Sequence, residues 1–176
     1  MSILSEKKTA STEIYKGKIV TLKRDTAELE NGKQVIREVV EHFDGVVIAA
    51  EINGKIIFVK QFRYPLQEVL YELPAGKLDS EKEDVLSAAK RELEEETGYV
   101  SQNWKNLGYV WSSPGFCTER IYIFKASGLS FKGQHLDEDE FLDVELIEKD
   151  KVFDMIKQGV INDAKSVAAV MKAYKL

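Results

Sequence analysis

Three glutamates are spaced so that a helix would bring them to one side of its surface. Glu92, Glu95 and Glu96 stand at positions i, i+3 and i+4, which are neighbours on a helix that turns by about 100° per residue. Like charges at this spacing repel one another, and acids in the last turn also oppose the helix dipole. A divalent cation would relieve both penalties, because Mg²⁺ prefers carboxylate oxygens. An isolated E-x-x-E-E run is usually a solvated acidic face, so the surrounding residues must decide.

The helix that would carry these glutamates is indicated by the apolar residues around them. They recur at three- and four-residue spacing and form one stripe, made of Val85, Leu86, Ala89 and Leu93. Gly98 follows the last of them, where a residue in the left-handed conformation commonly ends a helix. The pattern therefore predicts a helix over the second half of the stretch 76–99, with the glutamates in its final turns.

This stretch resembles the signature of the Nudix hydrolases, G-x5-E-x7-R-E-U-x-E-E-x-G-U, in which U is a bulky apolar residue. The matching positions are Gly76, Glu83, Arg91, Glu92, Leu93, Glu95, Glu96, Gly98 and Tyr99. Six residues rather than five separate Gly76 from Glu83, so either the loop has one insertion or Lys82 takes the glutamate position. Tyr99 stands where an aliphatic residue is usual. Many fixed positions in a short stretch make the match specific.

Other segments are similar to one branch of that family, the ADP-ribose pyrophosphatases. They are residues 61–65 (QFRYP), 71–78 (YELPAGKL) and 113–116 (SPGF). Pro114 lies fifteen residues after Tyr99, a placement that resembles the marker of this branch. The resemblance covers about residues 35–147. It implies a Nudix α/β/α sandwich with a mixed β-sheet, preceded by a small N-terminal antiparallel β-sheet.

The resemblance also implies a metal site. Its ligands would be the backbone carbonyl of Ala75 and the side chains of Glu92, Glu95 and Glu96. Glu95 is counted among the catalytic residues as well. Mg²⁺ is the expected ion, with Mn²⁺ as an alternative, and such ions neutralise a pyrophosphate and activate water. Arg91 and Glu83 are expected to support the ligands, because a guanidinium can hold a carboxylate in one rotamer.

Four further residues receive roles from the resemblance. Glu138 is our first choice for the base that activates water, and Glu140 is the alternative or an additional metal ligand. Arg63 is expected to contact the diphosphate or the terminal ribose, and Arg37 to contribute from the N-terminal strands. We expect Phe116 to belong to the core. His42, His135 and Cys117 have no convergent partners in the sequence, which supports neither a nucleophilic triad nor a zinc site.

The order of patterns along the chain predicts two domains. Residues 1–43 form an N-terminal β-hairpin region, expected to serve dimerisation and substrate contact, and residues 44–176 form the Nudix hydrolase domain. Residues up to about 12 read as a frayed lead-in, and the Pro74-Ala75-Gly76 segment reads as a loop that brings its backbone beside the helix carboxylates. The polar segment 127–139 reads as a loop before the last strand.

Composition limits the classes of function. The 176 residues carry a net charge of −5, which disfavours binding to nucleic acid or to an anionic membrane. One cysteine and the lack of a signal-like or membrane-spanning apolar run predict a cytoplasmic protein.

The leading hypothesis is a homodimeric enzyme that hydrolyses ADP-ribose to AMP and ribose 5-phosphate with metal-activated water. The alternatives are a broader nucleoside-diphosphate-sugar pyrophosphatase, for example on GDP-mannose, and a non-catalytic nucleotide-sensing module. Sensors can lose the acidic face, which is intact here.

Overall fold

The computed structural model describes residues 4–80, 82–136 and 141–176. The chain divides into two compact units. The first contains residues 1–43 together with 111–119, and the second contains residues 44–110 and 120–176. The segment 111–119, which the sequence pattern placed in the hydrolase domain, therefore belongs with the N-terminal strands.

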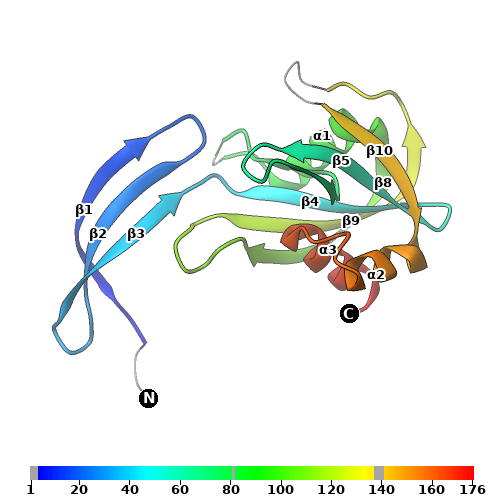
Figure 1. Ribbon diagram of the computed structural model, residues 1–176. Helices are drawn as coiled ribbons and strands as arrows, with labels where there is room; N and C mark the ends of the chain where they lie inside the picture. Colours follow the sequence, from blue (N-terminus) through cyan, green and yellow to red (C-terminus); the bar gives the residue numbers. More distant parts are fainter. Residues whose placement is uncertain (1–3, 81, 137–140) are drawn as a thin grey trace. The chain divides into compact units, whose positions relative to one another are not determined.

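The N-terminal unit is a three-stranded antiparallel sheet in the order β1-β2-β3, coloured blue to cyan in Figure 1. Its strands are β1 (Lys7–Lys16), β2 (Thr21–Glu28) and β3 (Gln34–Glu41). Between β2 and β3, Gly32 adopts φ 79°, a conformation that suits the Asn-Gly turn expected there. The expectation of a frayed start was wrong, because residues 7–16 form β1. Every residue of β1 is exposed, so the strand has no apolar alternation to reveal it.

The second unit is built on a mixed sheet whose main path is β10-β5-β4-β9-β8, with β6 paired to β5 and β7 paired to β4. β4 runs parallel to β9, and the other registers resolved in this sheet are antiparallel. The strands are β4 (Gly45–Ile52), β5 (Lys55–Arg63), β6 (Glu68–Glu72), β7 (Ala75–Lys77), β8 (Tyr99–Trp111), β9 (Arg120–Phe131) and β10 (Leu142–Glu148). The continuous apolar runs of β4 and β5 are buried on both faces, as expected for strands covered from both sides.

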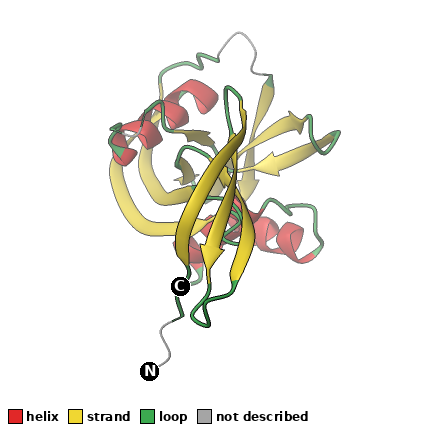
Figure 2. Cartoon of the chain, turned by 90° about the vertical axis from the view of Figure 1, so that its left-hand side faces the viewer, coloured by secondary structure: helices red, strands yellow, loops and turns green. Residues whose placement is uncertain are grey.

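Helices cover both faces of this sheet, as Figure 2 shows. Alternate residues of β4 serve the two faces. Val46 and Ile48 pack with Leu93 of α1 (Val85–Thr97). Val47, on the opposite face of the sheet, packs with α2 (Lys149–Lys157) and α3 (Ala164–Tyr174), where Val170 is buried. The three layers confirm the expected α/β/α sandwich. No helix in the described ranges is long and apolar enough to cross a membrane.

Two element predictions need correction. The segment from Ala75 to Lys77 is a short strand rather than a loop, and it pairs with β4 through Val46 and Gly76. A strand of three residues is too short to show alternation. β9 continues to Phe131, into a segment that was expected to be a loop. Its added residues, 127–131, are partly or fully exposed and include a glycine and two serines, a composition that favoured a loop.

Candidate active site

The helix α1 begins and ends where its sequence sets the limits. The side chain of Asp84 accepts a hydrogen bond from the backbone N–H of Ser87 at 2.9 Å, which satisfies one of the unpaired donors of the first turn. At the other end, Gly98 has φ 72° and its N–H bonds to the carbonyl of Glu94, as a left-handed cap requires. These two caps fix the register in which the glutamates face the sheet.

Two of the three glutamates are buried against the backbone of β7. Glu96 accepts a hydrogen bond from the N–H of Ala75 at 3.0 Å. The carboxylate of Glu92 lies against Gly76, so closely that a Cβ at position 76 would overlap it. Glu92 and Glu96 are both buried, whereas the side chain of Glu95 is 41% exposed. The expected proximity of the Pro-Ala-Gly backbone and the helix carboxylates is thus present, supplied by a strand.

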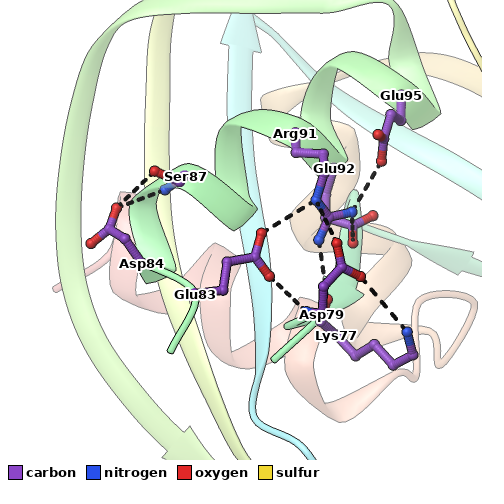
Figure 3. A network of polar contacts seen from close by, with 8 residues as sticks. All are labelled: Lys77, Asp79, Glu83, Asp84, Ser87, Arg91, Glu92 and Glu95. Carbon is purple, nitrogen blue, oxygen red and sulfur yellow. Dashed lines mark hydrogen bonds and ion pairs between the residues drawn. The ribbon is translucent and has the colours of Figure 1, made fainter. Parts of the chain in front are cut away.

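Arg91 organises the carboxylates from within the same helix, as Figure 3 shows. Its Nη1 donates to Glu92 at 2.8 Å and to Glu95 at 3.1 Å. Its Nε lies 3.4 Å from a Glu83 oxygen and 3.6 Å from an Asp79 oxygen. Burial disfavours the charged form of Arg91, but the surrounding carboxylates outweigh burial and raise the pKa of Arg91 above its ordinary value. The guanidinium therefore stays charged and holds the acids in fixed rotamers.

Glu83 meets Arg91 although the loop before it has one more residue than the family signature. Its second oxygen accepts a hydrogen bond from the N–H of Asp79 at 2.6 Å. Glu83 thereby links the two ends of the loop 79–83 and also contacts Arg91. The structure brings both supporting residues together, and their roles in activity remain predictions.

The chemistry of this set suits a hard divalent cation. In the part of the chain that the structure describes, no three acidic, histidine or cysteine side chains are gathered so that they could hold a metal alone. Glu92 and Glu96 do present buried carboxylates beside the backbone of β7, and Glu95 adds a partly exposed one. Mg²⁺ takes one or two protein carboxylates and completes its shell with water and substrate phosphates, so these residues fit such an ion.

The segment after β9 is tied to the end of α1. Gln134 donates from its side-chain amide to the carbonyl of Glu96 at 2.6 Å, and the N–H of His135 donates to the carbonyl of Glu95 at 3.1 Å. Gly98 is in contact with this segment, because a Cβ on it would meet the backbone of Gly133 and Gln134. Glu138 and Glu140, the predicted bases, lie outside the described residues.

Arg63 is clamped by a buried acid that the sequence analysis did not single out. Nε and Nη2 of Arg63 donate to the two oxygens of Glu72 at 2.6 and 2.7 Å. The side chain of Glu72 is only 2% exposed, and that of Arg63 is 39% exposed. A charged residue within the apolar run of β6 was the available signal, because a buried glutamate needs a partner.

The other predicted contacts lie in the N-terminal unit. Arg37 forms a two-bond pair with Glu6, at 2.9 Å from Nε and 2.7 Å from Nη2. Its role toward a substrate remains a prediction. Phe116 was expected in the core, but it is 55% exposed; it sits in a turn whose backbone bonds, from Phe116 and Cys117 to Ser113, fix the loop without burying the ring.

Comparison with known proteins agrees with this arrangement. The profile of the NUDIX domain matches residues 42–170, and that of the nucleoside diphosphate sugar hydrolase N-terminal domain matches residues 6–40. An ADP-ribose pyrophosphatase of Bacillus subtilis is 40% identical, covering 97% of this chain and 93% of that protein. A methanol dehydrogenase activator of Bacillus methanolicus is 44% identical, covering 97% and 94%. The crystal structure of an ADP compounds hydrolase superposes with a TM-score of 0.87 at 20% identity, over 98% of this chain and 94% of that one.

The chain belongs to the Nudix hydrolase family. It falls in the branch represented by the ADP-ribose pyrophosphatases, and it is therefore an enzyme that hydrolyses pyrophosphate bonds. Enzymes of this family generally depend on divalent metal ions, which agrees with the carboxylates on α1.

Proposed function

We propose that this protein is a cytoplasmic, Mg²⁺-dependent enzyme that hydrolyses ADP-ribose to AMP and ribose 5-phosphate. The observation that carries the proposal is the packing of Glu92 and Glu96 against the backbone of Ala75 and Gly76. Carboxylates that a globular protein buries need a compensating charge or hydrogen bonds. Here they are held in place beside a partly exposed third acid, on a helix of the Nudix signature. The 40% identical ADP-ribose pyrophosphatase supports the choice of substrate.

The acidic and the basic residues of the site have different proposed roles. Glu92, Glu95, Glu96 and the carbonyl of Ala75 would hold the metal, which when bound neutralises the diphosphate and lowers the pKa of water. Arg91 keeps Glu92 and Glu95 in position. Arg63 meets the diphosphate.

The reaction is a displacement by water at phosphorus. A water oxygen bonds to one phosphorus of the diphosphate, and the bridging P–O bond breaks. The proton of the water passes to Glu138, or to Glu140 if that residue is the base. No bond forms between enzyme and substrate, so the two products leave as phosphate monoesters.

The second substrate hypothesis is a broader range of nucleoside diphosphate sugars, including GDP-mannose. The profile of residues 6–40, which is that of a nucleoside diphosphate sugar hydrolase N-terminal domain, is compatible with it. Both hypotheses use the same diphosphate chemistry, so only the base and the sugar distinguish them. The sensing module is the third hypothesis, and the full set of site carboxylates argues against it.

The methanol dehydrogenase activator among the relatives suggests a second, regulatory function. In this function the same site would raise the activity of a dehydrogenase. Adding the protein to a methanol dehydrogenase tests it. Activation by the wild-type chain that the Glu96→Gln variant lacks would support this role. Equal activity with and without the protein would contradict it.

We further propose that the enzyme is a homodimer in which the N-terminal sheet meets a second copy. The N-terminal unit exposes several large apolar side chains, namely Ile14, Tyr15 and Ile36 on the strands and Ile19 between β1 and β2. Large apolar side chains left exposed on one unit are consistent with a surface that a partner covers. A molar mass near 40 kDa by light scattering would support the dimer, as twice the chain mass of 20.0 kDa, and a monomer mass would contradict it.

The decisive assay measures phosphate monoester release from ADP-ribose, GDP-mannose, UDP-glucose and diadenosine polyphosphates, each with Mg²⁺ and with EDTA. Cleavage of ADP-ribose alone, abolished by EDTA, supports the proposal. Comparable cleavage of several sugars supports the broader hypothesis. Nucleotide binding without cleavage supports the sensing module. Replacing Mg²⁺ with Mn²⁺ in the same assay tests the choice of ion.

A further inference from the structure

The first turn of the last helix reaches the strand that leads into the active site. Lys165 donates through Nζ to Glu72, the same buried carboxylate that clamps Arg63. The side chain of Lys165 is 17% exposed. It also contacts Asp163 at 3.0 Å. Two cations and two acids from distant parts of the chain therefore form one neutral cluster, which we call the Glu72 cluster (Arg63, Glu72, Asp163 and Lys165).

The cluster is fixed to α3 by a second set of bonds. Asp163 caps the helix by accepting from the N–H of Ser166 at 3.0 Å and from its hydroxyl at 2.6 Å. The Ser166 oxygen in turn accepts a hydrogen bond from the N–H of Leu73 at 2.8 Å. Ser166 and Leu73 are both fully buried. The residue after Glu72 is therefore bonded to the same helical turn that supplies Lys165.

This arrangement determines which nitrogens of the Arg63 guanidinium are occupied. Nε and Nη2 of Arg63 are hydrogen-bonded to Glu72. Among the described residues, none accepts a hydrogen bond from Nη1. A guanidinium held on one edge by a carboxylate presents its remaining N–H groups in a fixed plane, which suits the oxygens of a phosphate. The Glu72 cluster thus orients Arg63 while leaving donors for an anion.

Lys165 contributes to keeping that clamp ionic. Burial favours the neutral form of Glu72, but hydrogen bonds from Arg63 and the charge of Lys165 outweigh burial and lower the pKa of Glu72. A single guanidinium on a buried carboxylate would be fully neutralised by it. Lys165 places a second positive charge beside Glu72, so Arg63 does not balance this carboxylate alone.

We propose that Lys165 is a positioning residue for the diphosphate site: through Glu72 it sets the orientation and the effective charge of Arg63. The inference rests on the proposed function, in which Arg63 meets the diphosphate. It assigns to α3, a helix outside the Nudix signature, a part in substrate binding.

The test compares Lys165→Met, Lys165→Arg and the control Lys157→Met. Lys157 makes a similar short-range pair with Asp154, but both side chains are largely exposed. We expect Lys165→Met to raise KM for ADP-ribose about tenfold while kcat changes less than about twofold, because a charge-assisted contact is lost away from the reacting atoms. Lys165→Arg should restore KM to near its original value, and Lys157→Met should change neither constant.

A second measurement reports on orientation without turnover. The NMR signal of the Arg63 Nε–H, assigned with Arg63→Lys, should be sharp in the wild-type protein and broadened in Lys165→Met. An unchanged signal and unchanged KM in Lys165→Met would overturn the proposal. So would a fall in kcat and in melting temperature that accompanies the rise in KM and that Lys165→Arg does not restore. If the wild-type chain leaves ADP-ribose intact while the signal still broadens, the proposed function fails and the positioning role stands.

Discussion

The N–H of Ala75 donates to the carboxylate of Glu96 at 3.0 Å, and this bond joins the short strand β7 to the last turn of α1. The contact fixes a helix residue and a strand residue that are 21 positions apart next to each other at one corner of the candidate active site. An amide oxygen can accept the same bond, so the charge of Glu96 can be removed with little change to this corner.

Glu96→Gln should therefore leave the fold intact and lower kcat by about a thousandfold or more, because a charged metal ligand is lost from a preorganised site. Glu94→Gln is the matched control. It changes the same helix two residues earlier, where Glu94 faces Lys132 at 3.7 Å. The measurements are kcat at saturating Mg²⁺ and the melting temperature. Near-normal turnover of Glu96→Gln would contradict the metal assignment.

Gly76→Ala should damage the site through sterics alone. The added methyl group would overlap the Glu92 carboxylate, and overpacking of this kind destabilises proteins by about 1–3 kcal/mol. A displaced ligand can lower kcat by roughly a hundredfold. Gly115→Ala is the control, because nothing lies within 4 Å of a Cβ added there. Full activity of Gly76→Ala with an unchanged melting temperature would contradict this prediction.

Arg63→Ala should raise KM for ADP-ribose about tenfold to a hundredfold with a smaller effect on kcat, since it removes charge-assisted hydrogen bonds to the substrate. Arg63→Lys should fall between the wild-type protein and Arg63→Ala, because it keeps the charge but lacks the planar fork. Steady-state kinetics with ADP-ribose checks both. An unchanged KM in Arg63→Ala would remove the residue from the site.

The stability of the wild-type protein should depend on the ionisation of Glu72. The pKa of Glu72 is lowered on folding, so its contribution is complete above the unfolded pKa of about 4.3 and is lost as the pH falls through the folded pKa. Melting curves of the wild-type protein and Glu72→Gln should therefore differ most at neutral pH and converge as the pH falls from about 4.3 through the lowered folded pKa. A constant difference down to low pH would show that Glu72 ionisation does not contribute.

Comparison of Glu138→Gln with Glu140→Gln should identify the base. We expect Glu138→Gln to lower kcat by about a hundredfold or more and to flatten the acidic limb of the pH profile, as loss of a general base does. Glu140→Gln should keep most of the activity. If the two variants behave in the opposite way, Glu140 is the base and our first choice was wrong.

The central helix and the inner strands could be predicted because their signals are local. Asp84 and Gly98 cap α1, and the apolar stripe of the helix ends at the second cap. β4 and β5 are apolar on both faces, which only buried strands require. The crowding of Glu92, Glu95 and Glu96 was equally visible, because helix geometry converts sequence spacing directly into proximity.

Other features could not be predicted because they depend on residues far apart in sequence or on the absence of a pattern. The pairing of Lys165 with Glu72 joins positions 93 residues apart, and no local rule connects a lysine in one helix to a glutamate in a strand. β1 is exposed along its whole length and so lacks alternation. β7 was missed because three residues carry too little signal, although its backbone was correctly expected beside the glutamates.

The hydrogen bond between Leu73 and Ser166 has a consequence for biosynthesis. The two residues are 93 positions apart, which at about 5–20 residues per second corresponds to roughly 5–20 s of translation. During that interval the strand that carries Glu72 has been synthesised, while the helical turn that binds it does not yet exist. The helix with the acids proposed as metal ligands is therefore synthesised well before the Glu72 cluster can orient the arginine proposed to bind the diphosphate. On these proposed roles, the order of synthesis places the cation site ahead of the contacts that orient the diphosphate arginine.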